Sequence, residues 1–430
     1  MKKEDIVYTS MCCDFVHVGH IRIINQSLKY GKLIVGLMTD EAICSYKRVP
    51  MLSYDKRKEV VESIKGVWKV VPQNTLSYKE NLLILKPAVV TNGTDWREGP
   101  LKEIRQEVIG ILKEWNGRLI EFPYTKFISS SKIIKSLKRE GITTDERLCK
   151  LRHLINCKPI VRVLEAHNGL SGLVVEKTKA NGKEFDAIWE SSLTDSASKG
   201  KPDIELVDFT SRTQRINEIL EVTTKPIIVD GDTGGMPEHF CYMVRTLERL
   251  GVSAVIIEDK KFPKKNSLLE GAKHEQEDME IFCEKIKAGK KAQLTEEFMI
   301  VARIESLIIP QHGSDILDAV LRATYYIDAG ADGIMIHSKD KKPDKILEFC
   351  KEYKKLKKKV PLVAVPTTYN TITEKELQEA GVNVIIYANY PLRSAYQAMV
   401  DVAKTILIHE RAMEAETICY PVKDLLEMIR

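Results

Sequence analysis

Eight short apolar runs, each separated from the next by a helical pattern, fill the second part of this 430-residue chain. Two of the helical patterns span 238–251 and 315–330. Eight alternating β/α units over about 270 residues are typical of a (β/α)8 barrel, so we predict that fold here. The runs are Ile160–Glu165, Ala187–Glu190, Ile227–Asp230, Ala254–Glu258, Met299–Glu305, Gly333–His337, Leu362–Val365 and Val384–Tyr387.

Polar residues stand at the ends of six of these runs. In a barrel of this kind the C-terminal ends of the strands form the active-site face. We therefore expect six side chains to converge on one mouth: Glu165, Trp189, Asp230, Glu258, Arg303 and His337.

The first part of the chain also alternates apolar runs with amphipathic segments, which indicates a parallel α/β sheet. Its runs are Ile6–Tyr8, Leu33–Leu37, Ala88–Thr91 and Arg118–Phe122. Between the two parts, Gly141–Asp145 combines a helix stop with a new helix cap. We place a first domain at 1–140, a linker at 141–158, and the barrel with its C-terminal helices at 159–430.

The composition predicts a soluble intracellular protein and does not indicate nucleic-acid binding. Lys and Arg number 66 against 61 Asp and Glu, a net charge of +5, which suits small anionic substrates better than polyanions. No apolar run reaches the ~18 residues that span a bilayer. The nine cysteines form no CxxC pair, and Met1–Asp5 is not followed by the apolar core of a signal peptide. We expect a cytoplasmic protein without nucleic-acid or membrane partners.

Two strand ends carry clustered carboxylates. Asp230 and Asp232 follow one apolar run, and Glu258 and Asp259 close the next. Carboxylates on neighbouring strand ends suit one hard cation such as Mg²⁺. Arg303 interrupts an otherwise apolar run, where a charge needs an ion pair in the core or an anionic ligand. His337 is alternatively a hydrogen-bonded core histidine.

Five motifs between residues 159 and 414 together resemble the phosphoenolpyruvate mutase family of the isocitrate lyase superfamily. Lyase members of that superfamily carry a Lys-Lys-Cys-Gly-His motif that this chain lacks, whereas the Glu-Asp-Lys-x-x-Pro-Lys-x-Asn-Ser pattern of the mutase branch is intact. The motifs are Glu165–Ser171, Trp189–Leu193, Asp230–Gly235, Glu258–Ser267 and Ile336–Lys339.

The resemblance implies a Mg²⁺ ion bound by Asp230, with Asp232 and Glu258 holding it through waters. It makes Asp203 the catalytic aspartate, for which a helix cap after Pro202 is the alternative. Phosphoenolpyruvate and phosphonopyruvate would be the substrates. Trp189, Ser191, Leu193, Arg303 and His337 would surround the phosphoryl group, and Lys264, Asn266 and Ser267 would belong to a gating loop that closes over it.

In the first part, His17 and His20 flank Gly19 at the start of a predicted helix, after Asp14. A helix N-terminus attracts phosphate, and two imidazoles there would stabilise charge at an α-phosphate. Serines at 129–131 offer hydroxyls and amides before another helix, and they also fit a plain N-cap.

Residues 6–137 resemble the glycerol-3-phosphate cytidylyltransferase family, through His17–His20, Ser53–Lys58, Asp95–Trp96 and Ile128–Ser131. The resemblance implies a Rossmann-like nucleotidyltransferase domain with catalytic His17 and His20. Contacts to CTP would come from Lys47 or Arg48, Arg57, Asp95, Ser129, Ser130 and Ser131.

Two departures from that family stand out. The family has Gly-Thr-Phe-Asp where this chain has Met11–Asp14, and Arg-Thr-x-Gly where it has Tyr124–Phe127. The lost arginine indicates an altered acceptor site or a weakened activity, because Lys126 does not reproduce a bidentate guanidinium.

The two halves together resemble the bifunctional mutase–cytidylyltransferase of fosfomycin-type phosphonate biosynthesis. We expect interconversion of phosphoenolpyruvate and 3-phosphonopyruvate in the barrel, and CMP transfer from CTP to a phosphonate such as 2-hydroxyethylphosphonate in the first domain. One alternative is a mutase with a non-catalytic nucleotide-binding module; another is a phosphonopyruvate hydrolase barrel. The family also suggests a homotetramer with exchanged C-terminal helices, for which 391–412 is the candidate.

Overall fold

The computed structural model describes residues 5–46, 49–97, 101–123, 143–266, 274–309 and 315–429, without the side chain of Asp95. The chain divides into two compact units. One comprises residues 1–142 with 156–158, and the other comprises 143–155 with 159–430.

The first unit is built on a five-stranded parallel sheet in the order β3-β2-β1-β4-β5. Crossovers run in both directions from the central strand β1, as in doubly wound folds. Its strands are β1 (Ile6–Met11), β2 (Lys32–Met38), β3 (Val67–Gln73), β4 (Val89–Gly93) and β5 (Arg118–Phe122). Its helices are α1 (Val18–Ser27), η1 (Leu28–Tyr30), α2 (Asp40–Cys44), α3 (Tyr54–Glu62), α4 (Lys79–Leu85), η2 (Thr94–Arg97), α5 (Lys102–Leu112) and η4 (Lys113–Trp115).

Alternating residues of β1 and β2 divide this unit's core between the two faces of the sheet. Val7 and Leu33 pack with Ile24 of α1, and Tyr8 packs on the other face with Leu82 of α4. Strand β3 lies outside the four runs predicted above. It is an edge strand with an exposed Trp68 and a proline at position 72. Few of its residues are buried, so its sequence has no clear apolar pattern.

The second unit is a closed parallel barrel in the order β10-β11-β12-β13-β14-β15-β6-β9, and all eight predicted runs are strands of it. The (β/α)8 prediction is therefore confirmed, as is the parallel α/β sheet of the first unit. The barrel strands are β6 (Val161–Glu165), β9 (Ala187–Glu190), β10 (Ile227–Asp230), β11 (Ala254–Glu258), β12 (Met299–Ile304), β13 (Gly333–Ile336), β14 (Leu362–Ala364) and β15 (Val384–Tyr387), with a hairpin of β7 (Lys179–Ala180) and β8 (Lys183–Glu184) between β6 and β9.

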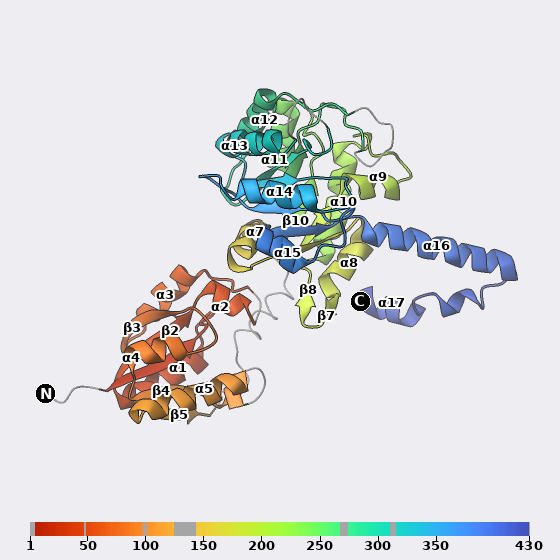
Figure 1. The fold of residues 1–430 in the computed structure, drawn as a ribbon. Helices are drawn as coiled ribbons and strands as arrows, with labels where there is room; N and C mark the ends of the chain where they lie inside the picture. Colours follow the sequence, from red (N-terminus) through yellow and green to blue (C-terminus); the bar gives the residue numbers. More distant parts are fainter. Residues whose placement is uncertain are drawn as a thin grey trace. The chain divides into compact units, whose positions relative to one another are not determined.

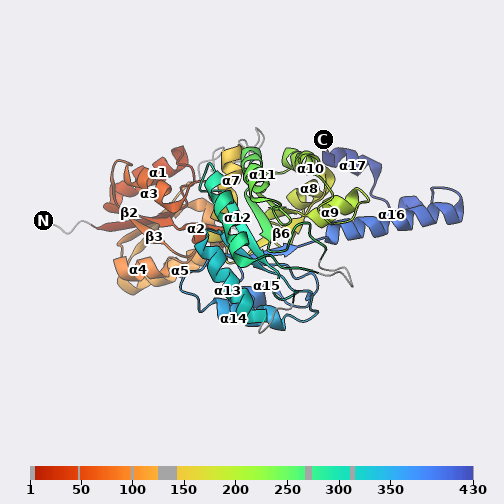
Figure 2. The ribbon, with the colours of Figure 1, turned by 90° about the horizontal axis from the view of Figure 1, so that it is seen from above.

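Helices cover the outside of the barrel, and their apolar stripes pack on the strands (Figures 1 and 2). Phe240 and Val244 of α11, Phe282 of α12 and Tyr326 of α13 are fully enclosed in this layer. The helices are α7 (Thr144–Cys157), α8 (Gly169–Lys177), α9 (Ser192–Ser198), α10 (Phe209–Val222), α11 (Pro237–Leu250), α12 (Met279–Ala292), α13 (Asp315–Asp328), α14 (Asp344–Tyr353), α15 (Glu374–Ala380), α16 (Tyr390–His409), η5 (Ala415–Thr417) and α17 (Val422–Ile429).

The stretch 141–158, predicted as a linker, contains helix α7. Arg147 donates from Nη2 to the carbonyl of Thr223, and its own carbonyl accepts from Ser253 Oγ at 2.7 Å. Leu148 is buried in the barrel's apolar core. The division at 1–140, 141–158 and 159–430 stays a proposal.

Helix α16 leaves the barrel after β15 and projects away from the barrel, and α17 runs back along α16 (Figures 1 and 2). Helix α16 has no buried residue. In the described residues, no helix is long and apolar enough to cross a membrane.

Candidate active site

The C-terminal ends of neighbouring barrel strands bring the predicted polar residues together. Glu258 at the end of β11 lies beside Arg303 of β12 in register, and Asp230 ends the adjacent strand β10. A pocket opens at these ends, as the barrel fold requires. It is lined by Trp189, Ser191, Leu193, Asp203, Asp230, Glu258, Lys260, Lys264, Asn266, Arg303, Met335, His337, Ser338, Val365, Thr367, Thr368, Ala388 and Asn389.

Asp230 is held from several sides at the base of this pocket. Its Oδ2 accepts from the backbone N (3.2 Å) and Oγ (2.8 Å) of Ser192, and its Oδ1 accepts from the backbone N of Asp232. Burial raises the pKa of Asp230, but the charges of Lys264 and Arg303 and the nearby Arg212 outweigh it and hold the pKa at about 2. The group is therefore an ionised carboxylate with a fixed orientation.

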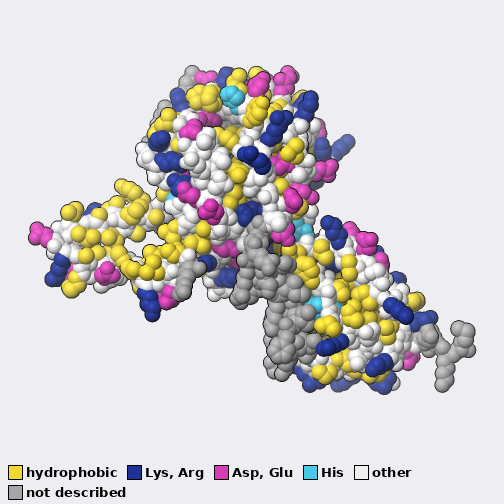
Figure 3. Space-filling model, turned by 180° about the vertical axis from the view of Figure 1, so that it is seen from behind, with side chains coloured by type: hydrophobic (Ala, Val, Ile, Leu, Met, Phe, Trp, Pro, Cys, Tyr) yellow, Lys and Arg dark blue, Asp and Glu magenta, His cyan; other side chains and the backbone are white. Residues whose placement is uncertain are grey.

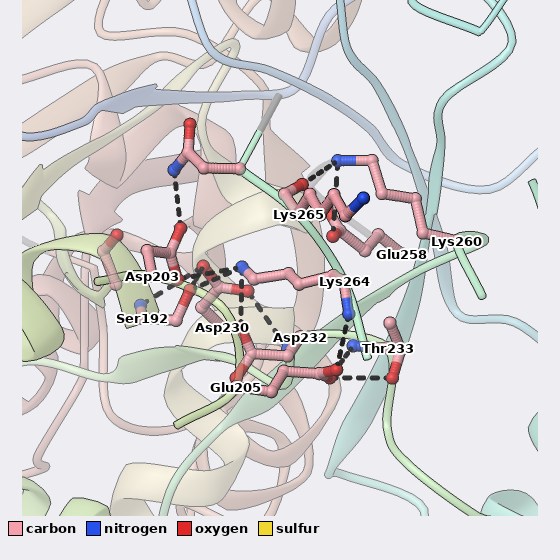
Figure 4. Close-up of polar contacts among 12 residues, drawn as sticks. Ser192, Asp203, Glu205, Asp230, Asp232, Thr233, Glu258, Lys260, Lys264 and Lys265 are labelled. Atoms are coloured by element: carbon pink, nitrogen blue, oxygen red, sulfur yellow. Dashed lines mark hydrogen bonds and ion pairs between the residues drawn. The ribbon is translucent and has the colours of Figure 1, made fainter. Parts of the chain in front are cut away.

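Lys264 reaches into the carboxylates from the loop after β11 (Figure 4). Its Nζ lies 2.7 Å from Asp232 Oδ1 and 3.2 Å from Asp203 Oδ1, and it donates to Ser192 Oγ at 2.9 Å. Burial lowers the pKa of Lys264, but Asp232 and Asp230 together raise it well above its ordinary value. A permanently charged ammonium thus sits among the carboxylates.

Asp203 is bound by the same loop. Asn266 Nδ2 donates to its Oδ2 at 2.6 Å while Lys264 pairs with its Oδ1. The alternative of a helix cap does not hold, because Asp208 caps the next helix, α10, by accepting from Ser211 N. Asp203 therefore faces the pocket rather than a helix end.

Arg303 and His337 line the pocket next to two buried carboxylates, Glu258 and Glu305. Arg303 Nη2 lies 3.1 Å from Glu258 Oε2, and its Nε donates to Glu305. His337 Nδ1 lies 2.8 Å from Glu305 Oε1. Burial, then Arg303, lowers the pKa of His337, so the ring is neutral near pH 7. Lys260 Nζ completes the group, 3.3 Å from Glu305 and 3.5 Å from Glu258.

The cluster fits a divalent cation. Six carboxylates (Glu190, Asp203, Asp230, Asp232, Glu258, Glu305) meet four cations (Arg212, Lys260, Lys264, Arg303). The carboxylates outnumber the cations, and hard carboxylate oxygens are the donors that Mg²⁺ prefers.

Buried oxygens with ion-pair contacts but no hydrogen bond in the same cluster support that fit. Both carboxylate oxygens of Glu258 and one each of Asp203 and Asp232 accept no hydrogen bond among the described residues, although Lys260, Lys264 or Arg303 pairs with each of them. Burial raises the pKa of Glu190 to about 7 although Arg212 pairs with it, and the charges of Asp195 and Asp230 add to the rise.

The structure departs from the predicted site in two ways. Glu165 does not line the pocket: its Oε1 pairs with His167 Nδ1 at 2.8 Å, and its Oε2 accepts at 3.4 Å from the backbone N of Leu392 in the first turn of α16. Glu305 and Lys260 were not singled out. Alternation along β12 places Glu305 on the side of Arg303, which is the signal that would have found it.

In the first unit, His17 and His20 lie side by side at the start of α1, with ring centroids 4.0 Å apart. His17 is the N-cap: its Nδ1 accepts from Gly19 N, and His20 Nδ1 accepts from His17 N. Burial lowers the pKa of His17. Because each Nδ1 accepts, the neutral rings carry their protons on Nε2, where they are donors for an anion at the helix start.

Asp14 and Arg57 fix the chain around these histidines. Asp14 Oδ1 accepts from the backbone N of Met51 and Leu52. Arg57 is fully buried and donates to the carbonyls of Cys12 and Leu52 and to Asp40. The structure thus places the Arg57 guanidinium inside the domain. Lys47, Arg48, Ser129, Ser130, Ser131 and Ser267 lie outside the described residues, as does the side chain of Asp95.

Residues 151–407 match the phosphoenolpyruvate phosphomutase family, and residues 12–136 match a cytidylyltransferase-like family. The chain belongs to the phosphoenolpyruvate phosphomutase family. The smaller match gives this enzyme an additional N-terminal cytidylyltransferase-like domain.

Two curated relatives with different activities are almost equally similar. The phosphoenolpyruvate phosphomutase of Tetrahymena pyriformis is 35% identical over 287 residues, covering 66% of this chain and 92% of that protein. The phosphonopyruvate hydrolase of a Variovorax species is 34% identical over 280 residues, covering 65% and 93%. Overall identity therefore does not separate the two reactions.

Solved structures give the same pair. A phosphoenolpyruvate phosphomutase from Streptomyces platensis subsp. rosaceus superposes with a TM-score of 0.60 at 37% identity, covering 65% of this chain and 93% of that one. Phosphonopyruvate hydrolase in complex with oxalate and Mg²⁺ superposes at 0.59 and 32% identity, covering 67% and 95%.

Proposed function

We propose that the barrel interconverts phosphoenolpyruvate and 3-phosphonopyruvate by intramolecular phosphoryl transfer, with Mg²⁺ as cofactor. The observation that carries this is the pocket itself: one cavity is lined by Arg303 and His337, by the carboxylates of Asp203, Asp230 and Glu258, and by Lys264 and Asn266. A phosphoryl group moving from oxygen to carbon passes through a loose, metaphosphate-like species. Catalysis then depends on holding both fragments in place and keeping water away.

The residues divide this work between them. Asp230, with Asp232 and Glu258, would hold the cation, which would neutralise charge on the substrate's oxygens. Asp203 orients or accepts the phosphoryl group. We assign the surrounding contacts to Trp189, Ser191, Leu193, Arg303 and His337, and closure over the substrate to Lys264, Asn266 and Ser267.

A hydrolase is the competing assignment, because one relative with that name is 34% identical. The contacts of Asn266 and Lys264 with Asp203 favour the mutase, since they cover the phosphoryl-handling carboxylate. Phosphorus NMR of the protein with Mg²⁺ and phosphonopyruvate tests this. Phosphoenolpyruvate without inorganic phosphate is the expected result; phosphate and pyruvate alone would make the barrel a hydrolase.

For the first unit we propose CMP transfer from CTP to a phosphonate such as 2-hydroxyethylphosphonate, a later step in phosphonate biosynthesis. The Nε2 donors of His17 and His20 at the start of α1 support it, because charge builds on the α-phosphate there. In this proposal Lys47, Asp95 and Ser129–Ser131 bind the nucleotide, and Arg57 fixes the loop backbone at Cys12 and Leu52.

Incubation with CTP and a panel of phosphonates tests that activity. The expected result is a CMP-phosphonate and pyrophosphate, lost in His20→Ala. Tight CTP binding with no transfer to any phosphonate would leave the domain a nucleotide-binding module.

We further propose a homo-oligomer, a tetramer by family resemblance, assembled through the C-terminal arm of α16 and α17. Apolar side chains gather over this arm (Figure 3), among them Leu407 and Ile408, which are 78% and 74% exposed. Light scattering of Leu407→Asp would show smaller particles than the wild type. All nine cysteines are free thiols, in keeping with a proposed cytoplasmic location.

A further inference from the structure

One carboxylate joins the loop after β10 to the loop after β11, which are two of the loops at the pocket. Glu205 Oε2 accepts from the backbone N of Lys264 at 2.9 Å. Its Oε1 accepts from Thr233, from the backbone N at 2.9 Å and from Oγ1 at 2.7 Å (Figure 4). Both oxygens of a single side chain are therefore occupied by different loops.

The backbone at Glu205 indicates that this placement is specific. Its φ is +58°, a left-handed conformation that non-glycine residues other than Asn and Asp adopt rarely. Three hydrogen bonds to one carboxylate hold it there, and hydrogen bonds to ionised acceptors are stronger than neutral ones.

The Thr233 side of this bridge is rigid. Thr233 is fully buried, and its carbonyl accepts from Lys285 Nζ, a buried lysine of α12, at 2.7 Å. It directly follows Asp232, so it belongs to the loop that carries the carboxylates. Whatever Glu205 holds is thus held relative to those carboxylates.

The Lys264 side is the loop that enters the pocket. The bond to Glu205 fixes the backbone at Lys264, and from there the ammonium reaches Asp232. Two residues on, Asn266 reaches Asp203. A shift of this backbone would withdraw both contacts together.

We propose that Glu205 is a positioning residue that latches this loop shut and so sets how much phosphoryl group goes to isomerisation and how much to water. The inference rests on the proposed mutase function. With the latch closed, the P–O bond of the enol phosphate breaks, and a bond from phosphorus to C3 forms. The reverse reaction breaks P–C3 and restores P–O.

With the latch open, water competes. Its oxygen bonds to phosphorus as the P–C3 bond of phosphonopyruvate breaks. The electron pair left on C3 takes up a proton, and the products are pyruvate and inorganic phosphate.

Glu205→Gln tests this while preserving side-chain size, because an amide presents only one acceptor and cannot serve both loops. The matched control is Asp208→Asn in the same segment, whose side chain contacts Ser211 and not the loop. Phosphorus NMR measures the ratio of phosphate to isomerised product. Glu205→Gln should raise it about tenfold, the loss expected for a charge-assisted hydrogen bond, and Asp208→Asn should leave it unchanged.

Hydrogen exchange of the Lys264 amide in the protein without substrate or added metal gives a second readout. It should exchange about tenfold faster in Glu205→Gln than in the wild type or the control. Unchanged exchange, or an unchanged product ratio from a wild type that isomerises, overturns the proposal. If the wild type itself releases only phosphate, the mutase proposal fails. The exchange rate of the Lys264 amide then tests by itself whether Glu205 holds the loop.

Discussion

The two candidate sites of this chain are built in opposite ways. In the barrel, charged side chains from four consecutive strands and the following loops pair with one another inside the protein, around Asp230 and Arg303. In the first unit, the candidate catalytic residues His17 and His20 lie together at the start of one helix, α1, where both are half-buried. The barrel site thus requires the whole closed sheet, whereas the histidine pair needs four residues in a row.

The difference bears on how each site meets its ligand. A buried network is preorganised: its charges cost desolvation that the fold has already compensated, and they act at full strength on a bound phosphoryl group. The half-buried histidines remain exchangeable with water until a nucleotide covers them. The variants below test whether the two sites are independent and whether the barrel's network is as tightly balanced as its contacts indicate.

The largest effect is expected for Asp203→Asn. The amide keeps the shape but loses the charge that pairs with Lys264 and faces the phosphoryl group. Isomerisation should fall about 10³-fold, as when a preorganised electrostatic contact to a transition state is removed. CMP transfer should not change. A parallel fall in CMP transfer, measured in the same preparation, would contradict independent sites.

His20→Ala is the reciprocal experiment. Loss of one Nε2 donor at the α-phosphate should lower CMP transfer about 10²-fold, with isomerisation unaffected. Asn25→Ala, at an exposed position on the same helix, is the control for nonspecific disturbance of α1. Equal effects of the two variants would mean that the histidine has no special role.

Lys264→Met tests the balance of charge in the barrel. Removing one member of a buried ion pair leaves its carboxylates uncompensated, so the free energy of unfolding should drop by about 3 kcal/mol without metal. Mg²⁺ should raise the Tm of this variant more than that of the wild type, because the cation replaces the lost charge.

Its neighbour provides the matched control. Lys265 is exposed, and Lys265→Met should change stability by no more than about 0.5 kcal/mol. Equal Tm shifts with Mg²⁺ in the wild type and in Lys264→Met would argue that the lysine and the cation do not share these carboxylates.

The smallest effect is expected for the ion pairs that Glu121 of β5 makes with Arg97 and Arg105 in the first unit. Hydrogen bonds from Arg105, then Arg97, hold the pKa of Glu121 well below its ordinary value. A carboxyl group whose pKa is lower in the folded protein than in the unfolded chain stabilises the fold at pH values above the unfolded-state pKa, near 4.5. This stabilisation is lost as the pH falls towards the folded-state pKa. Exchange of the β5 amides, corrected for intrinsic rates, should therefore accelerate below pH 4.5 in the wild type and less in Glu121→Gln. An identical pH profile would show that the cluster adds nothing measurable, as for many exposed pairs.

Some elements of the fold could be predicted from the sequence and others could not, for physical reasons. The eight barrel strands were predictable because most of their residues are buried and apolar, so that each reads as an apolar run even where Arg162 or Arg303 interrupts it. Strand β3 was not, because an edge strand with Trp68 and Lys69 in solvent has no such run.

The same contrast holds for the site. Asp230, Glu258 and Arg303 were predictable because strand ends of a barrel face one mouth. Glu205 was not predictable. It lies outside any helix or strand, with a left-handed φ, and its partner Lys264 is distant in the sequence, so no periodic pattern marks it.

The central claim is that the phosphoryl group moves between oxygen and carbon inside the closed pocket without meeting water. The direct test is to incubate the protein with phosphonopyruvate and Mg²⁺ in ¹⁸O-labelled water and follow the products by phosphorus NMR and mass spectrometry. The account predicts phosphoenolpyruvate whose phosphoryl group carries no ¹⁸O, with no more than a trace of phosphate. Labelled inorganic phosphate and pyruvate as the main products would contradict it.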